Sequence, residues 1–241
     1  MRIESVVNMG PQQREWIHLN IDVTVETADL RFNQAVKDAG SNVGQADLDH
    51  LSNNLDQLAE NIAVFTNKTR DALSPVWVFS DYDAYKDVFP EAAHLFEEQG
   101  RPHKVERGDN DDVIRKTEPN AVPDNVEYFE RLKGQGIKGV VITGLYADIC
   151  VLETAQSLLD EGFQVMVVED LVDTNLEETR AEGMQKLKDS GARMVSETQV
   201  MDALGHGQLN ELHRGSFTIE ESTQRNAGNT KSAQCISYLR L

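Results

Sequence analysis

Residues 138–151 read KGVVITGLYADICV and contain the clearest indication of the fold class. The run VVIT at 140–143 is apolar at almost every position, which is typical of a parallel strand buried on both faces. A short turn follows, and apolar residues then recur at the spacing of a helix, at Leu152, Ala155, Leu158 and Leu159. The stretch predicts a buried strand that turns into an amphipathic helix, with Cys150 at the start of that helix.

The same alternation of strand and helix patterns continues along the chain. Further apolar segments with a strand pattern lie at residues 16–23, 75–80, 112–116, 164–170 and 192–196. Helical stripes lie at 48–65, 126–132 and 181–187. Strands that alternate with helices need right-handed crossovers, which give a parallel sheet covered on both faces. We predict a doubly wound, Rossmann-like α/β/α fold of about six strands in a single domain.

The end of the chain has a different character. Residues 205–241 are polar, contain Gly and Ser, and are only weakly periodic. We therefore expect a domain over residues 1–204 and a polar C-terminal tail or arm over residues 205–241. Cys235 lies in this arm without a pattern of charged neighbours, and an incidental thiol is the simpler interpretation.

Composition excludes several classes of partner. The 241 residues carry a formal net charge of −18, which argues against binding to nucleic acid or to an anionic membrane. The sequence has neither the apolar core of a signal peptide nor a run approaching the ~18 apolar residues of a membrane span. Its two cysteines lie far apart and form no disulfide framework. We expect a cytoplasmic protein with reduced thiols.

Three chemically distinct residues fall at the carboxyl ends of the expected strands. Asp22 closes the first strand, Lys116 closes the third, and Cys150 follows the fourth. Ligands of open parallel sheets bind at this edge. A helix N-terminus and a nearby ammonium favour a thiolate, and a carboxylate can accept the thiol proton and later return it to a leaving amine. The three residues together predict an activated cysteine nucleophile.

These residues and their surroundings resemble the isochorismatase-like cysteine hydrolases, the superfamily that holds nicotinamidases and carbamoyl- and ureido-amidohydrolases. The resemblance covers residues 15–204 and is carried by three segments: LNID ending at Asp22, VIRKTEPNAV around Lys116, and TGLYADICV ending at Val151. The downstream stretch LLDEGFQVMVVEDLVDT, residues 158–174, also looks like the helix, strand and loop of the family.

The resemblance implies a catalytic triad of Asp22, Lys116 and Cys150, with an oxyanion hole formed by the backbone N–H groups of Tyr146 and Cys150. It also implies a non-proline cis peptide in the Gly144–Ala147 turn, at Leu145–Tyr146. The family members that hydrolyse the vinyl ether of isochorismate lack the nucleophilic cysteine. The chain therefore looks like an amide-cleaving member that requires no cofactor.

Several positions depart from the family pattern. Tyr146 stands where a small residue is common and, with Leu145, Tyr82 and Asn120, is a candidate for the substrate pocket. Nicotinamidases have Asp-Trp-His after the second strand, where Asp and His bind a metal; here the sequence reads SDYD. No metal is expected, although Asp81 and Asp83 leave a hard-ligand pair for Mg²⁺ or Ca²⁺ as an alternative.

The leading hypothesis is a cysteine amidohydrolase that cleaves a C–N bond of a small amide, ureido or carbamoyl substrate through a thioester. The alternative is a catalytically silent scaffold that uses the same fold for binding or assembly. A nucleotide-binding function is set aside because no strand is followed by a Gly-rich phosphate loop. The resemblance also implies a homo-oligomer, either a dimer or a tetramer. His103 and His206 lack partners at metal-ligand spacing and are expected to lie at the surface or in loops.

Overall fold

The computed structural model describes residues 15–40, 45–50, 54–81, 83, 86, 90–96, 101–174 and 177–217. Six strands form one sheet in the order β3-β2-β1-β4-β5-β6, and every neighbouring pair is parallel. From β1 the chain adds β2 and β3 on one side of the sheet and then β4, β5 and β6 on the other, as in a doubly wound fold. The predicted fold class is confirmed.

The strands lie close to the segments predicted from apolar patterning. Their bounds are β1 Trp16–Ile21, β2 Ser74–Ser80, β3 Asp112–Lys116, β4 Gly139–Leu145, β5 Gln164–Asp173 and β6 Arg193–Val195. β1, β4 and most of β5 are buried at successive positions because helices cover both faces of the sheet.

Helices connect the strands. Their bounds are α1 Val25–Ala28, α2 Leu30–Asp38, α3 Gln45–His50, α4 Asp56–Thr69, α6 Val126–Gly134, α7 Cys150–Asp160, α8 Glu177–Asp189, α9 Glu197–His206 and α10 Leu209–Arg214. Two 3-10 helices, Pro90–Phe96 and Pro123–Asn125, complete the described elements. Among the residues described, none of these helices is both long and apolar enough to cross a bilayer.

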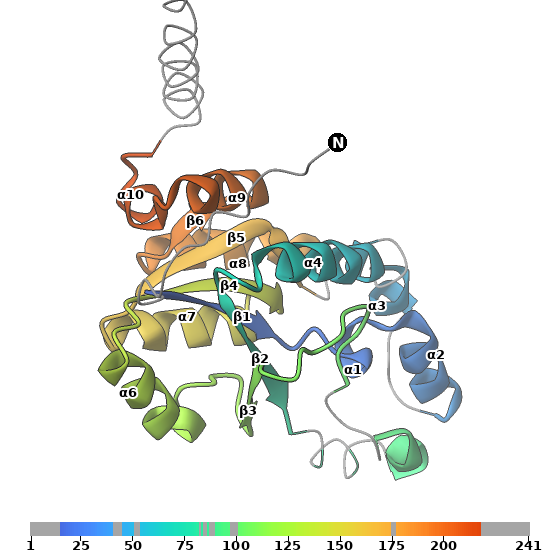
Figure 1. Ribbon diagram of the computed structural model, residues 1–241. Helices are drawn as coiled ribbons and strands as arrows, with labels where there is room; N and C mark the ends of the chain where they lie inside the picture. The colour runs from blue at the N-terminus through green and yellow to red at the C-terminus, as the bar shows by residue number, and fades with distance from the viewer. Residues whose placement is uncertain are drawn as a thin grey trace, which may run out of the picture.

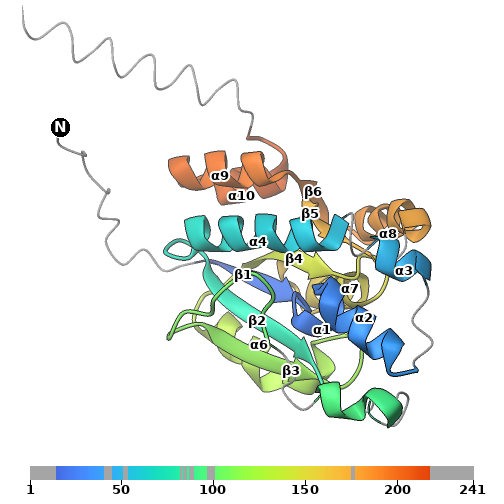
Figure 2. The same cartoon turned by 90° about the vertical axis from the view of Figure 1, so that its right-hand side faces the viewer.

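Helices cover both faces of the sheet (Figures 1 and 2), and an apolar cluster packs on each face. On one face α6, α7 and α8 contribute buried residues that include Phe129, Leu158 and Leu187. On the other face the long stripe from α3 and α4 packs beside α9 and α10. The result is the three-layer α/β/α arrangement that the alternating pattern predicts.

The packed domain extends beyond the boundary expected from the sequence. Position 204 falls inside α9, which ends at His206, and α10 buries Leu209 and Leu212 against the sheet. Asn210 accepts a hydrogen bond from Trp16 Nε1 at 3.0 Å. Residues 205–217 of the expected arm therefore pack on the domain, and the rest of that arm, residues 218–241, lies outside the described residues. The weak periodicity concealed these two short helices.

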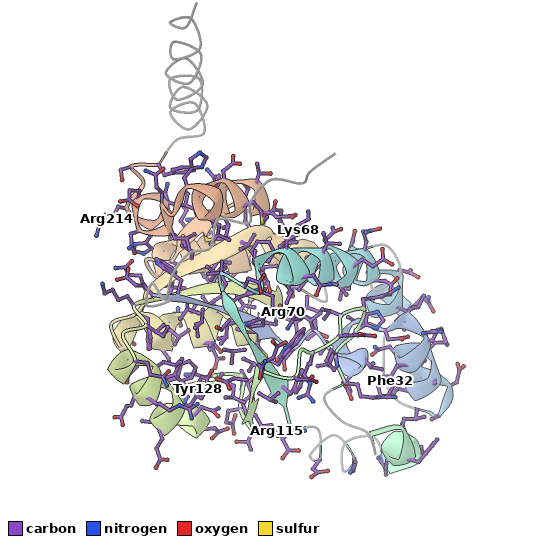
Figure 3. The ribbon with its side chains drawn as sticks, in the orientation of Figure 1. Phe32, Lys68, Arg70, Arg115, Tyr128 and Arg214 are labelled. Atoms are coloured by element: carbon purple, nitrogen blue, oxygen red, sulfur yellow. The ribbon has the colours of Figure 1, made fainter. Side chains whose placement is uncertain are left out.

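The edge strand β3 is anchored at its start from two helices. Arg70, which follows α4, forms an ion pair with Asp111, whose carboxylate also accepts a hydrogen bond from Trp77 Nε1. Tyr128 of α6 donates to Asp112 Oδ2 at 2.9 Å. Figure 3 labels both Arg70 and Tyr128. These bonds hold the strand that carries Lys116 at its other end.

β1 and β4 approach each other closely at Gly144. An alanine Cβ at this position would lie 2.1 Å from the carbonyl oxygen of Ile21, and the backbone φ is +121°. Only glycine adopts that conformation without strain, and only glycine has no side chain to clash there. Gly144 thus allows the ends of β1 and β4 to lie side by side.

Gly144→Ala is expected to lower the free energy of unfolding by about 3 kcal/mol, because the new methyl group meets rigid backbone. Urea denaturation at constant m-value measures the loss. Gly134→Ala is the matched control, since a Cβ there meets nothing within 4 Å, and it should change stability by less than about 1 kcal/mol. Equal effects of the two substitutions would contradict the packing argument.

Candidate active site

The structure brings the three predicted residues into contact. Lys116 Nζ lies 2.9 Å from Asp22 Oδ2 and 3.4 Å from Cys150 Sγ. Asp22 directly follows β1, Lys116 ends β3, and Cys150 begins α7. The cluster lies at the carboxyl edge of the sheet, beside the point where the strand order reverses between β1 and β4.

The backbone around Asp22 holds its carboxylate in the site. Asp22 has a φ of +50°, in the left-handed region that aspartate tolerates better than most residues. Its amide donates to the carbonyl of Val78 at 3.0 Å, and its own carbonyl accepts from Thr27 Oγ1. With only 3% of its side chain exposed, Asp22 has little freedom to turn away.

The short segment of residues 101–103 packs against the residues that follow Asp22. The amide of His103 donates to Val23 O at 3.0 Å, and the amide of Val25 donates to Arg101 O at 2.9 Å. His103 is buried and its Nε2 lies 2.8 Å from Asp56 Oδ1. His103 lies in a loop, as expected, and its side chain is buried because it connects this loop to α4.

Ser80 is a fourth member of the cluster that the sequence reasoning missed. Its amide and its hydroxyl both lie 2.9 Å from Asp22 Oδ1, and its Oγ lies 2.7 Å from Lys116 Nζ. Ser80 ends β2, between the strands that carry Asp22 and Lys116. The rule that strand ends meet at one edge could have found it, but only if β2 were known to lie between β1 and β3.

Lys116 is a fully buried ammonium with three acceptors. Its side chain is 1% exposed and its Nζ faces Asp22, Ser80 and Cys150. Burial by itself lowers the pKa of this amine, but the charge of Asp22, followed by that of Cys150, raises the pKa above its ordinary value. Lys116 therefore stays charged throughout the neutral pH range.

The electrostatics of Cys150 differ from the expectation. Burial, followed by the negative charge of Asp22, raises the pKa of the Cys150 thiol to about 12, although the Lys116 ammonium opposes the shift. The expectation of a lowered pKa is wrong, because Asp22 neutralises Lys116 and the thiol is half-buried. The resting site holds a neutral thiol beside an ion pair, so a base must remove the thiol proton during attack.

The turn before Cys150 is firmly held. Its Leu145–Tyr146 peptide is cis, at the position implied by the family resemblance. The carbonyl of Tyr146 accepts from the amides of Ile149 and Val151, and Asp148 accepts from Thr174 Oγ1 at 2.6 Å. The first N–H groups of a helix lack an intrahelical acceptor, which suits the amide of Cys150 to binding an anion.

The proposed pocket residues have different surroundings. Leu145 is 1% exposed and lies in the apolar core, and Asn120 donates to Ser157 Oγ at 2.6 Å while accepting from the amide of Val122. Leu145 is thus held by the core and Asn120 by α7, and their assignment to the substrate pocket stays a prediction. Tyr146 is partly buried against the apolar cluster of α4 and α9, and Tyr82 lies outside the described residues.

The alternative metal ligands are occupied by protein groups. Asp81 Oδ1 accepts the amide of Asp83 at 3.0 Å, and Asp83 Oδ1 lies 2.8 Å from Lys86 Nζ. Within the described part of the chain, no three His, Cys, Asp or Glu side chains are grouped as metal ligands. An ammonium at the Asp83 carboxylate disfavours a cation there, so these residues do not fit a metal centre.

The fold and the Asp–Lys–Cys cluster define a doubly wound α/β protein with a cysteine at the carboxyl edge of its sheet. The family model described as the isochorismatase domain matches residues 45–199. The chain belongs to the isochorismatase family.

One curated relative is the probable hydrolase YcaC of Escherichia coli, which is 34% identical over 91 residues. That match covers 38% of this chain and 40% of YcaC, so the chain matches about two fifths of the relative's length. A structure of the YcaC gene product, described as an octameric hydrolase of unknown specificity, has a TM-score of 0.51 at 18% identity. It covers 92% of this chain and 96% of that one.

Two other solved structures share the fold. An isochorismatase family protein from Burkholderia thailandensis has a TM-score of 0.60 at 19% identity, covering 80% of this chain and 96% of that chain. A pyrazinamidase of Pyrococcus horikoshii, solved in complex with zinc, has a TM-score of 0.53 at 16% identity and covers 76% and 99% of the two chains. At these identities the likeness establishes the fold alone.

Iodoacetamide is expected to modify Cys150 slowly near neutral pH, because the thiolate is the nucleophile and the thiol pKa is raised to about 12. The rate should continue to rise with pH beyond the point where a free thiol of pKa ~8.5 levels off. Mass spectrometry of the peptide that contains Cys150 follows the reaction.

Lys116→Met is the informative partner of this measurement. Loss of the Lys116 charge should slow the modification of Cys150 further, because this charge opposes the rise in the Cys150 pKa. A wild-type profile with an apparent pKa below that of a free thiol would overturn this account.

Proposed function

We propose that this protein is a cysteine hydrolase that cleaves a C–N bond of a small amide, ureido or carbamoyl compound. The observation that carries the proposal is the contact of one buried ammonium with both a carboxylate and a thiol, at 2.9 and 3.4 Å. Family membership is in keeping with it. A silent scaffold would gain nothing from burying these three groups together, since burying charges is costly.

The first half of the reaction forms a thioester. Asp22 removes the proton from Cys150 as the sulfur attacks the substrate carbonyl carbon. The backbone N–H groups of Tyr146 and Cys150 bind the oxyanion of the tetrahedral intermediate. Protonated Asp22 then gives its proton to the leaving nitrogen, and the C–N bond breaks to release ammonia or an amine.

The second half of the reaction regenerates the thiol. Asp22 takes a proton from water, the hydroxide attacks the thioester, and the C–S bond breaks to release an acid. The proton returns from Asp22 to the Cys150 sulfur. Lys116 stays protonated throughout, so its charge stabilises the sulfur anion at the moment when the thiol has lost its proton.

The protein's own residues provide the base, the nucleophile and the oxyanion donors of this scheme, so we propose that no cofactor is required. In this proposal Asp81 and Asp83 bind no metal, and their carboxylates keep their contacts with the amide of Asp83 and with Lys86 Nζ. A cytoplasmic location belongs to the same proposal, because a reducing compartment keeps the nucleophile as a free thiol. Tyr146, four residues before the nucleophile in sequence and partly buried, is the side chain we assign to the wall of the substrate pocket.

A homo-oligomer is also part of the proposal, since the YcaC gene product is described as octameric. Multi-angle light scattering of the full chain at micromolar concentration should give a mass at least twice that of one chain. A mass equal to one chain would reject this part of the proposal without touching the chemistry.

A panel of small primary amides, ureido compounds and carbamoyl compounds should reveal turnover as released ammonia. Cys150→Ala and Asp22→Asn should each lower kcat by at least about 100-fold, in keeping with the loss of a nucleophile or a general base. Asp22→Asn should also allow an acyl-enzyme, heavier by the acyl group, to be detected by intact-mass spectrometry if deacylation becomes limiting.

Two controls define this test. Dialysis against EDTA should leave turnover unchanged, because no step uses a metal. Cys235→Ala should retain the wild-type rate, which assigns the thiol chemistry to Cys150. Full turnover by Cys150→Ala would falsify the proposed mechanism.

A further inference from the structure

The strongest unassigned feature of the site is Ser80, whose hydroxyl lies between the two charged groups. Its Oγ is 2.7 Å from Lys116 Nζ and 2.9 Å from Asp22 Oδ1, and its amide also lies 2.9 Å from the same carboxylate oxygen. The residue is half-buried at the end of β2. Neither the thioester chemistry nor the family resemblance assigns a role to it.

The direction of these hydrogen bonds follows from the chemistry of the donors. A lysine ammonium can only donate, so the Ser80 oxygen must accept from Lys116. The single hydroxyl proton of Ser80 is then directed to Asp22 Oδ1, because a carboxylate accepts. Reversing this chain would require Lys116 to be neutral, which its raised pKa excludes near pH 7.

Ser80 thereby completes the surroundings of the buried ammonium. Lys116 has three N–H protons, and its three acceptors are Asp22 Oδ2, Ser80 Oγ and Cys150 Sγ. Two oxygen acceptors at fixed positions determine the direction of the third proton, which points to the sulfur. Without the Ser80 oxygen, the ammonium could rotate away from Cys150 at little cost.

Ser80 also distinguishes the two oxygens of Asp22. Oδ1 accepts from both the amide and the hydroxyl of Ser80, whereas Oδ2 pairs with Lys116. Lys116 Nζ, which pairs with Oδ2, also lies 3.4 Å from Cys150 Sγ, so Oδ2 and the sulfur share one ammonium. With Oδ1 occupied by two donors, Oδ2 is the oxygen that is available to take the thiol proton.

We propose that Ser80 is a positioning residue that directs the Lys116 ammonium toward Cys150 and reserves Asp22 Oδ2 as the proton acceptor. This inference rests on the proposed function, because it assigns Ser80 a part in activating the same nucleophile. Ser80 acts through Lys116 and Asp22 and needs no contact with substrate.

The test measures Cys150 modification by iodoacetamide against pH in five proteins: wild type, Ser80→Ala, Ser80→Thr, Ser80→Val and the control Ser190→Ala. Ser80→Ala should slow modification at pH 8 by about tenfold, the effect expected from losing a hydrogen bond to a charged group. Its profile should shift to higher pH, because Lys116 no longer faces the sulfur as closely. Ser80→Thr keeps the hydroxyl and should stay within about twofold of wild type.

Ser190→Ala removes a hydroxyl directly after α8 that donates to Leu187 O at 2.7 Å, remote from the cluster in sequence, and it should leave the profile unchanged. Ser80→Val, compared with Ser80→Thr, separates the loss of the hydroxyl from a loss of stability. Valine and threonine have nearly the same shape and differ in the hydroxyl. The Thr and Val proteins should therefore differ about tenfold in rate at equal melting temperature.

The inference is overturned if Ser80→Ala has the wild-type rate and pH profile, or if Ser80→Thr is as slow as Ser80→Val. The second result would mean that packing, and not the hydroxyl, matters at this position. Because the readout needs no substrate, a failure of wild type to hydrolyse any amide would count against the proposed function alone. A normal Ser80→Ala profile beside active wild type would count against the role of Ser80 alone.

Discussion

The site depends on a lysine ammonium buried at the carboxyl edge of a parallel sheet. A buried charge is tolerated only when its donors are satisfied, and Lys116 meets this requirement with a carboxylate, a hydroxyl and a thiol. The three acceptors come from the ends of β1 and β2 and from the start of α7. The ammonium therefore fixes the relative positions of three strand ends and places Cys150 against an ion pair.

This arrangement changes how the thiol can act. Because Asp22 neutralises much of the effect of Lys116, burial dominates and the pKa of Cys150 rises. The site is suited to transfer of the Cys150 proton to Asp22 during attack and does not hold a stable thiolate at rest. An exposed thiolate would react with any electrophile, whereas a neutral thiol beside a carboxylate becomes nucleophilic only when a carbonyl carbon is positioned to receive the sulfur.

Sequence reasoning found Asp22, Lys116 and Cys150 because strand ends can be read from apolar runs and because parallel strands end at one edge. It missed Ser80, since an ordinary serine at a strand end has no distinctive pattern. It assigned Leu145 and Asn120 to the pocket but could not show that Leu145 packs in the core and that Asn120 is hydrogen-bonded to α7. It also ended the domain too early, because α10 is short and its buried residues are few.

The fold class, the strand positions and the three residue types at the carboxyl edge follow from the amino-acid sequence, because period and burial are properties of local patterns. Which strands are neighbours, that Ser80 joins Asp22 to Lys116, and whether Lys116 lowers the pKa of Cys150 or only limits its rise, depend on the packed fold. Those outcomes depend on distances and desolvation among residues as far apart in the chain as Asp22 and Cys150. No local pattern encodes them, because they arise only when the sheet has formed.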